Sequence, residues 1–170
     1  MNTLITGGAG FIGSNLVDLL LEKKFNVTII DNLSTGYLKN IDPEKVEFIE
    51  GDVRDFELVN KLAKNKDVVF HLAASIGNSK SIAHPQQDSE INVIGTINVL
   101  EAARNNSVNK VVYSSSAAIF GELFTMPIDE THPQNPDSPY SAVIPKFIKL
   151  MLSGESPVIY GDGSTSRDFT

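Results

Sequence analysis

The sequence contains no cysteine and only three histidines, the residue type that most often supplies a nitrogen ligand to a metal. Without cysteine the chain can form neither disulfide bonds nor thiolate metal sites, and it has no thiolate nucleophile. The three histidines, His71, His84 and His132, do not show the spacing of a zinc-ligand set. We therefore expect neither a disulfide framework nor a metal site.

Long apolar runs are missing as well. No stretch approaches the ~20 residues of a membrane-spanning helix, and a buried-strand pattern begins within two residues of Met1, where a secretory signal would carry a charged region. The formal net charge of −7 disfavours electrostatic capture of nucleic acid or acidic membranes. The sequence thus predicts a cytoplasmic protein that binds neither nucleic acid nor membranes.

Short apolar, β-branched runs recur through about residue 116, with helical patterns between most of them. Strands this uniformly apolar are buried on both faces, which is typical of a parallel sheet with helices above and below. The predicted fold is therefore α/β: a Rossmann-like, doubly wound parallel sheet with helices on both faces. The expected strands are centred on Leu4-Ile5, 27–30, 46–49, 68–70 and Val111-Val112.

Two helices are clearly indicated. The first is expected over residues 11–24, and the second, long helix begins at Pro85, which suits a first helical turn, and runs to Arg104. In the first helix the pattern directs Phe11, Ile12, Leu16, Leu19 and Leu20 towards the sheet and Asp18 and Glu22 outward. In the second, an apolar stripe is formed by Ile91, Ile94, Ile97 and Leu100.

The segment TGGAGFIG carries the strongest signal for function. It places Gly7, Gly10 and Gly13 directly after a predicted strand and at the start of a predicted helix. Glycine is needed where the turn is tight and where backbone N–H groups must approach a phosphate without an intervening Cβ, and the helix N-terminus adds partial positive charge. In this context the motif predicts that the turn holds the pyrophosphate of a dinucleotide.

Two acidic residues extend this prediction. Asp31 ends the second strand 18 residues after Gly13, close to the ~20 expected for the acid that binds the adenosine ribose, and its carboxylate favours NAD over NADP. The alternative is an ordinary cap or turn aspartate. Asp52 and Val53 follow the third strand, where they can clasp adenine, although an exposed turn fits them equally well.

The fourth strand ends in His71-Leu72-Ala73-Ala74. Small residues are needed here, where a ribose and phosphates lie against the backbone. His71 itself fits a packed strand residue better than a catalyst.

These motifs, in order, resemble one family. TGGAGFIG, DNLSTG (31–36), GDVRD (51–55), HLAA, INVIGTINVLEAAR (91–104) and SSSAAIFGE (114–122) are similar to the extended short-chain dehydrogenase/reductases, specifically the NAD-dependent UDP-sugar 4-epimerases. The resemblance implies NAD as cofactor and a UDP-sugar of the UDP-glucose/UDP-galactose type as substrate. It also implies that the NAD site is lined by Gly7, Gly10, Phe11, Ile12, Gly13, Asp31, Asn32, Leu33, Ser34, Thr35, Gly36, Asp52, Val53, Leu72, Ala73, Ala74, Ser75, Ile76 and Asn92.

The resemblance further identifies Ser116 as the catalytic serine and Tyr140, 24 residues later, as the catalytic tyrosine. A turn tyrosine after Pro139 is the alternative for Tyr140. Related dehydratases and decarboxylases carry an acid just after the serine or threonine, where this chain has Ala117 and Ala118. The absence of that acid favours simple oxidation and re-reduction at C4, which is epimerisation.

One position departs from the family. Members have a lysine four residues after the tyrosine, and this chain has Ile144. Because a free tyrosine has a pKa near 10, only roughly one in a thousand is a phenolate at pH 7 without that cation. Lys146 is a poor substitute, since six helical residues place it roughly 160° from the four-residue position and Pro145 disfavours helix before it. An NAD-binding protein without catalytic activity is therefore the alternative function.

The sequence after Tyr140 resembles a later part of the same family. Our hypothesis is an internal deletion joined at Ser138-Pro139-Tyr140, which removes the catalytic helix and the sixth strand. Residues 1–140 are then the NAD-binding domain, and residues 141–170 are the remnant of a substrate-binding region.

This deletion has consequences for the rest of the chain. Arg167 matches an arginine that binds the UDP phosphates in the family, with an exposed arginine as the alternative. Without a sixth strand, the sheet edge beside Val111-Val112 is expected to be unpaired. Family homodimers use the helix matching 85–104 together with the helix after the tyrosine, and the deletion leaves only the first of these intact, so the resemblance implies a homodimer with one of its two interface helices missing.

Overall fold

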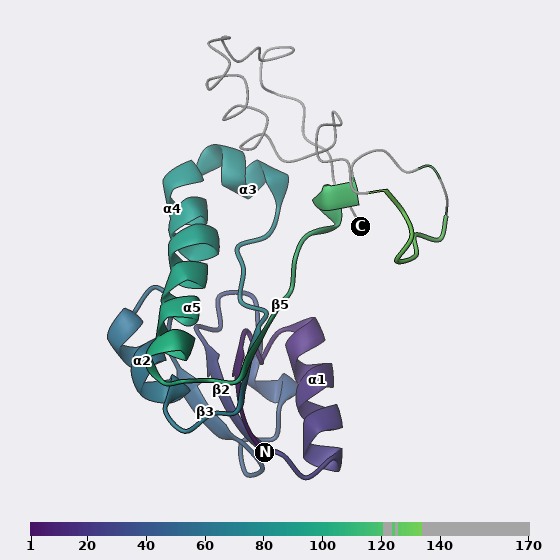
Figure 1. The fold of residues 1–170 in the computed structure, drawn as a ribbon. Coiled ribbons are helices and arrows are strands. Elements are labelled where there is room, and N and C mark those ends of the chain that lie inside the picture. The colour runs from purple at the N-terminus through teal and green to yellow at the C-terminus, as the bar shows by residue number, and fades with distance from the viewer. Residues whose placement is uncertain (121–123, 125, 134–170) are drawn as a thin grey trace. The chain divides into compact units, whose positions relative to one another are not determined.

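The computed structural model describes residues 1–120, 124 and 126–133 (Figure 1). Residues 1–114 form one compact unit, and a second unit begins at Ser115. The predicted domain boundary at residue 140 lies outside the described residues. No helix in the described part of the chain is long and apolar enough to cross a membrane.

The first unit is built on a five-stranded sheet with the order β3-β2-β1-β4-β5. All four strand pairs are parallel, and Thr6 at the end of β1 lies opposite both Ile30 and His71. The five predicted strands and the parallel sheet are confirmed. The strands are β1 (Asn2–Thr6), β2 (Asn26–Asp31), β3 (Glu47–Glu50), β4 (Val68–His71) and β5 (Lys110–Tyr113).

Helices cover both faces of this sheet, as predicted. Figure 1 shows α1 on one side and α2 and α5 on the other, the arrangement that right-handed crossovers produce when the chain winds outward in both directions from β1. The helices are α1 (Phe11–Glu22), α2 (Phe56–Ala63), α3 (Asn78–Ala83), α4 (Pro85–Ser89), a π-helical turn (Glu90–Ile94) and α5 (Gly95–Asn105); 3-10 turns span Leu38–Asn40 and Ala117–Phe120.

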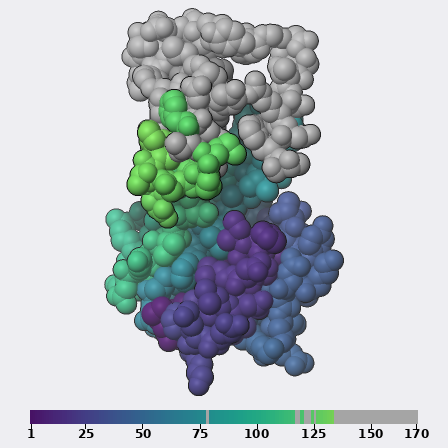
Figure 2. All heavy atoms as spheres, turned by 90° about the vertical axis from the view of Figure 1, so that its right-hand side faces the viewer, coloured from purple at the N-terminus to yellow at the C-terminus, as the bar shows by residue number. Residues whose placement is uncertain are grey.

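The predicted orientation of α1 is partly wrong. Leu20 is buried and Leu16 packs against the core, as expected, but Phe11, Ile12 and Leu19 are 85%, 63% and 47% exposed. The reason is that the buried face of the helix begins with small residues, Gly13 and Ser14, and continues through Val17 and Leu20. The helix therefore lies close to the sheet through this narrow stripe. Figure 2 shows α1, in purple, on an open face of the molecule.

The predicted long helix forms as α4, the π-helical turn and α5 in succession. It packs through Gly95, Val99, Ala102 and Ala103, and a Cβ added at Gly95 would lie 2.6 Å from Cγ2 of Val53. The apolar stripe of the sequence is not the packing face, because Ile94, Ile97 and Leu100 are each about half exposed.

The core divides into two clusters by the alternation of side chains along the strands. Leu4 and Ile30 lie in one cluster with Val59 of α2 and Val99 of α5. Ile5 and Ile29 lie in the other with Val17 and Leu20 of α1.

Beyond β4, the edge strand β5 pairs with no other strand among the described residues. The second unit is described only in part, and in it His132 is buried, with the Phe120 ring edge-on to it and the Phe124 ring stacked on it.

Two neighbouring leucines test the orientation of α1. Leu20→Ala is expected to lower the free energy of unfolding by about 2–5 kcal/mol, because it leaves a cavity in the core. Leu19→Ala, the same change at an exposed position, should cost less than about 1 kcal/mol. Urea denaturation of both variants measures the difference, and equal losses would contradict the orientation of the helix.

Candidate functional site

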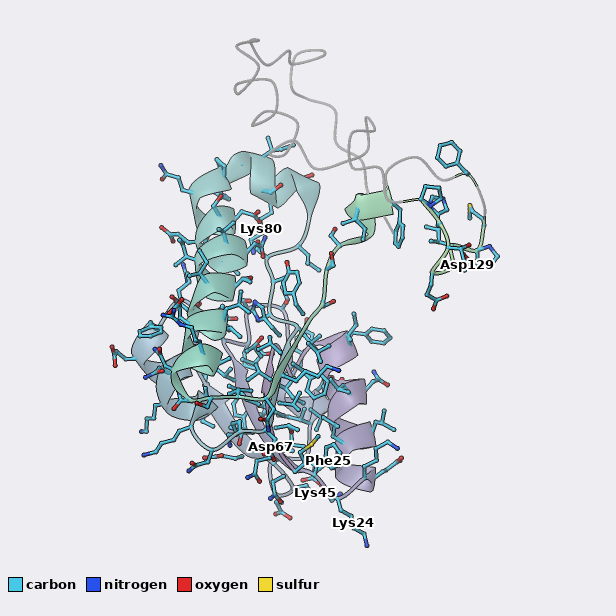
Figure 3. All side chains as sticks on the ribbon, in the orientation of Figure 1. Lys24, Phe25, Lys45, Asp67, Lys80 and Asp129 are labelled. Atoms are coloured by element: carbon cyan, nitrogen blue, oxygen red, sulfur yellow. The ribbon has the colours of Figure 1, made fainter. Side chains whose placement is uncertain are left out.

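The residues predicted to bind a ligand gather at the carboxyl edge of the sheet. Lys24, Phe25, Lys45 and Asp67 mark the opposite, amino edge (Figure 3). From β1 the chain winds first to β2 and β3 and then crosses back to β4, so β1 lies at the switch point of the topology. Open α/β sheets bind ligands in the crevice that this reversal leaves at the carboxyl ends of the strands.

The turn after β1 depends on glycine at two positions. Gly7 has a φ of +74°, and a Cβ on it would lie 2.7 Å from the backbone nitrogen of Ala73. A Cβ on Gly13 would overlap the carbonyl oxygen of Gly7. The first glycine lets the chain turn beside the end of β4, and the second lets α1 begin directly against that turn.

The N-terminus of α1 is open. Gly10 is the N-cap residue, no side chain caps the helix, and its first turn carries no acidic residue. The N–H groups of a first helical turn have no acceptor within the helix. Together with the positive end of the helix dipole, they form a site suited to an anion such as a phosphate.

The Asp31 carboxylate fastens the turn to the end of β2. It is buried, with one oxygen accepting from the N–H of Ala9 at 2.9 Å and the other from the N–H of Leu33 at 2.8 Å. Each carboxylate oxygen can accept a second hydrogen bond. Asp31 can therefore bind a ligand hydroxyl while it holds both loops in place.

The loop from Asn32 to Gly36 lies against the same turn. A Cβ on Gly36 would lie 2.9 Å from the carbonyl carbon of Ala9, and the N–H of Tyr37 donates to the Ala9 carbonyl at 3.1 Å. Within the loop, the side chain of Asn32 accepts from the N–H of Ser34. The described contacts thus hold this loop and the glycine turn together.

Asp52 links the loop after β3 to the loop after β2. Its carboxylate accepts hydrogen bonds from Asn32 and from the guanidinium of Arg54, each at 2.9 Å. The hydrogen bonds from Arg54 hold the pKa of Asp52 far below its usual range. Arg54 also pairs with Glu90, at 3.3 Å. Asp52 is consequently a fixed anion at the carboxyl edge, beside the buried Val53.

The turn after β4 is held by Asn92. The Asn92 side chain accepts from the N–H of Ser75 at 2.8 Å and donates to the Ser75 carbonyl at 3.0 Å. The Ser75 hydroxyl is buried and has no hydrogen-bond partner among the described residues. A buried hydroxyl without a partner is costly, so a ligand that hydrogen-bonds to it would remove this cost.

The predicted site residues of the first unit lie in these loops, at the end of β2 or at the start of α1, except Asn92, which lies in the π-helical turn and reaches the loop after β4. Leu72 and Ala73 are half-buried, whereas Ala74 and Ile76 are exposed. Ser116 is exposed and belongs to the second unit. Tyr140, Ile144 and Arg167 lie outside the described residues.

Several positioning residues were not predicted from the sequence. Asn40 donates to the Ala9 carbonyl at 2.8 Å, Arg54 fixes Asp52, and Thr6 accepts from the N–H groups of Leu72 and Ala73. Thr6 and Arg54 have one sequence signal, a polar side chain at or just after a strand end, whereas Asn40 lies in a 3-10 turn and has no such signal. In the described part of the chain, no group of three histidine or acidic side chains is placed to hold a metal ion.

Comparison with known proteins gives consistent matches. The family model described as GDP-mannose 4,6 dehydratase matches residues 4–143. The putative UDP-glucose 4-epimerase of Methanocaldococcus jannaschii is 40% identical, with 98% of this chain and 68% of the relative covered. The UDP-glucose 4-epimerase of Mycolicibacterium smegmatis is 35% identical, with 99% and 69% covered.

Solved structures of epimerases are also similar to this one, and two serve as examples. A UDP-N-acetylglucosamine 4-epimerase from Methanobrevibacter ruminantium, in complex with UDP-N-acetylmuramic acid, has a TM-score of 0.70 and 38% identity, covering 99% of this chain and 68% of the other. The UDP-glucose 4-epimerase of Thermus thermophilus, in complex with NAD, has a TM-score of 0.72 and 37% identity, covering 91% and 51%.

This chain is shorter than the span over which it matches its relative. The match to the M. jannaschii protein extends over 208 positions, although this chain has 170 residues. The relative therefore carries residues inside the matched span that have no counterpart here. With the parallel sheet, the glycine turn and these matches taken together, the chain belongs to the nucleotide-sugar epimerase and dehydratase family that includes the UDP-glucose 4-epimerases.

Proposed function

We propose that this chain binds NAD at the carboxyl edge of its sheet and acts as a UDP-sugar 4-epimerase. The observation that carries the proposal is that hydrogen bonds connect the loops at the carboxyl edge. The loop after β2 joins the glycine turn that follows β1, the loop after β3 joins the loop after β2, and the loop after β4 joins the end of β1. Family relatives named UDP-glucose 4-epimerase, and a similar structure in complex with NAD, support it.

The residues present fit the dinucleotide. The open N–H groups at the start of α1 suit the pyrophosphate, and Gly7 and Gly13 keep that turn free of side chains. Asp31 retains acceptor capacity for a ribose hydroxyl. In this proposal Asp52 and Val53 contact adenine, and the Ser75 hydroxyl, which has no partner among the described residues, offers a further hydrogen bond.

The family resemblance supplies the chemistry. Bound NAD would supply the hydride acceptor for oxidation at C4 of the sugar and the hydride donor for re-reduction on the opposite face. In this proposal Tyr140 removes the proton of the 4-hydroxyl, Ser116 hydrogen-bonds to that oxygen, and Arg167 contacts the UDP phosphates. Ala117 and Ala118 supply no acid for dehydration.

A second candidate is an NAD-binding protein that does not epimerise. Ile144 favours it, because a lysine about 4 Å from the tyrosine would supply about 4 kcal/mol, or about 3 pKa units, towards the phenolate. The residues that the M. jannaschii relative has within the matched span, and that this chain lacks, also fit an internal deletion. Sequencing the genomic locus tests whether the deletion is natural. An uninterrupted 170-codon frame, without the missing segment nearby, would contradict the hypothesis that the deletion is an artefact of the sequence.

NAD binding has a direct test at Asp31. Asp31→Ala is expected to raise the Kd for NAD by about tenfold or more, because the ribose loses an acceptor and the two loops lose their shared anchor. Asp18→Ala, on the exposed side of α1, is the control and should leave the Kd unchanged. Isothermal titration calorimetry measures both, and an unchanged Kd for Asp31→Ala would mean that Asp31 does not bind the ribose.

Catalysis is tested by measuring NAD binding and UDP-galactose epimerisation on the same preparation. The epimerase proposal predicts turnover that Tyr140→Phe abolishes while NAD affinity is retained. NAD binding without turnover in the unmodified chain would favour the second candidate. If NAD gives no heat and saturating cofactor leaves thermal stability unchanged, both candidates are wrong.

The proposed assembly is a homodimer through the long helix. Ile94, Ile97 and Leu100 present a half-exposed apolar stripe there, and family homodimers use this helix. Ile97→Lys is expected to shift a dimer to monomer, because it places a charge in the buried centre of the interface. Leu19→Lys, at the similarly exposed position on α1, is the control. Sedimentation velocity measures the mass, and a monomeric wild-type chain would contradict the dimer.

A further inference from the structure

A chain of polar contacts runs from β1 through β4 to α5, next to the candidate site. His71, at the end of β4, is only 2% exposed. Its Nδ1 lies 2.7 Å from the Thr6 hydroxyl at the end of β1, and its Nε2 lies 3.0 Å from the Thr96 hydroxyl on α5. The ring therefore links the central strand of the sheet to the long helix.

The other contacts of the two hydroxyls determine where the ring proton lies. The Thr96 hydroxyl donates to the Asn92 carbonyl at 2.7 Å, so it accepts from the ring, and Nε2 must carry the proton. The Thr6 hydroxyl accepts from the N–H groups of Leu72 and Ala73, at 3.2 and 3.1 Å. Its hydrogen is then free to be donated to Nδ1.

This arrangement satisfies every donor and acceptor only when the ring is neutral. A proton on Nδ1 would remove the acceptor of the Thr6 hydroxyl hydrogen, and it would face an oxygen that already accepts from the Ala73 N–H and shares the Leu72 N–H with the Thr6 carbonyl. Burial acts in the same direction, because it lowers the pKa of His71 to about 4. At neutral pH the ring is thus one fixed tautomer and not a proton donor to a substrate.

The two ends of this chain of contacts reach the turn after β4. Thr6 holds the backbone of Leu72 and Ala73, and the helical turn that carries Thr96 also carries Asn92, which holds the backbone of Ser75. Ala73 is in turn the residue against which Gly7 packs.

We propose that His71 is a positioning residue for the dinucleotide site: as the neutral Nε2–H tautomer it orients the Thr6 hydroxyl, and thereby fixes the turn 72–75 against the glycine turn. The positioning role rests on the proposed NAD site, whereas the protonation state of the His71 ring can be tested without NAD. His71 contacts no ligand in this role and acts through Thr6.

Two substitutions distinguish the contact of Nδ1 with Thr6 from the contact of Nε2 with Thr96. In His71→Asn the side-chain oxygen can take the place of Nδ1 and accept from Thr6, whereas in His71→Gln the amide nitrogen can take the place of Nε2 and donate to Thr96. We expect the Kd for NAD of His71→Asn to stay within about threefold of wild type. We expect His71→Gln to raise it about tenfold, as for one hydrogen bond lost from a buried network.

Urea denaturation of both variants provides the control for a merely structural role. If the loss of NAD affinity is proportional to the loss of stability in both variants, whether or not the acceptor for Thr6 is kept, the positioning role is wrong. Thr96→Ser, which keeps the hydroxyl, should bind NAD as wild type does. Should wild type bind no NAD, the proposed site fails, and the tautomer is then tested separately.

That separate measurement is the ¹⁵N NMR spectrum of the histidine rings in the ligand-free protein, with His71 assigned from the spectrum of His71→Asn. The expected result at pH 7 is a neutral ring with a protonated Nε2 and an unprotonated Nδ1. A proton on Nδ1, or a charged ring at that pH, would overturn the inference.

Discussion

The structure depends on the close approach of backbone to backbone at the glycine turn. Gly7 lies against Ala73, and Gly13 lies against the Gly7 carbonyl, at separations that leave no room for a Cβ. This contact brings the ends of β1 and β4 and the start of α1 into one small volume. The loop after β2 joins it through Ala9, and the positive end of α1 then faces the switch point of the sheet.

The contacts around this turn are mostly between backbone amides and short polar side chains. Asp31, Asn32, Asp52 and Asn92 each bind groups from a neighbouring segment. Hydrogen bonds to charged groups are stronger than neutral ones, which helps to fix loops that have little apolar surface of their own. The loops at the site are therefore held by polar contacts, and the strands below them by the apolar core.

Much of the first unit could be predicted from its sequence, since strands buried on both faces leave uninterrupted apolar runs and the glycine turn lies at a strand-to-helix junction. The orientation of side chains was harder. Phe11 and Leu19 suggest a wide apolar face, whereas α1 packs through Gly13 and Ser14 because small residues permit a closer approach. The contacts of Thr6 and Thr96 with His71 could not be predicted, because hydrogen bonds between residues 65 and 25 positions apart leave no local pattern in the sequence. Ser116 and Tyr140 rest on family resemblance alone.

The π-helical turn at Glu90–Ile94 lies between α4 and α5 and interrupts the regular α-helical period of the long helix. A wider turn of this kind accommodates one residue more than an α-helical turn, and one residue corresponds to about 100° of rotation. Asn92, within this turn, faces Ser75, while Ile97 and Leu100, beyond it, face outward. A regular 3.6-residue count carried across this turn therefore misplaces residues by about 100° of rotation, so no single apolar stripe in the sequence can follow one face of the helix from α4 into α5.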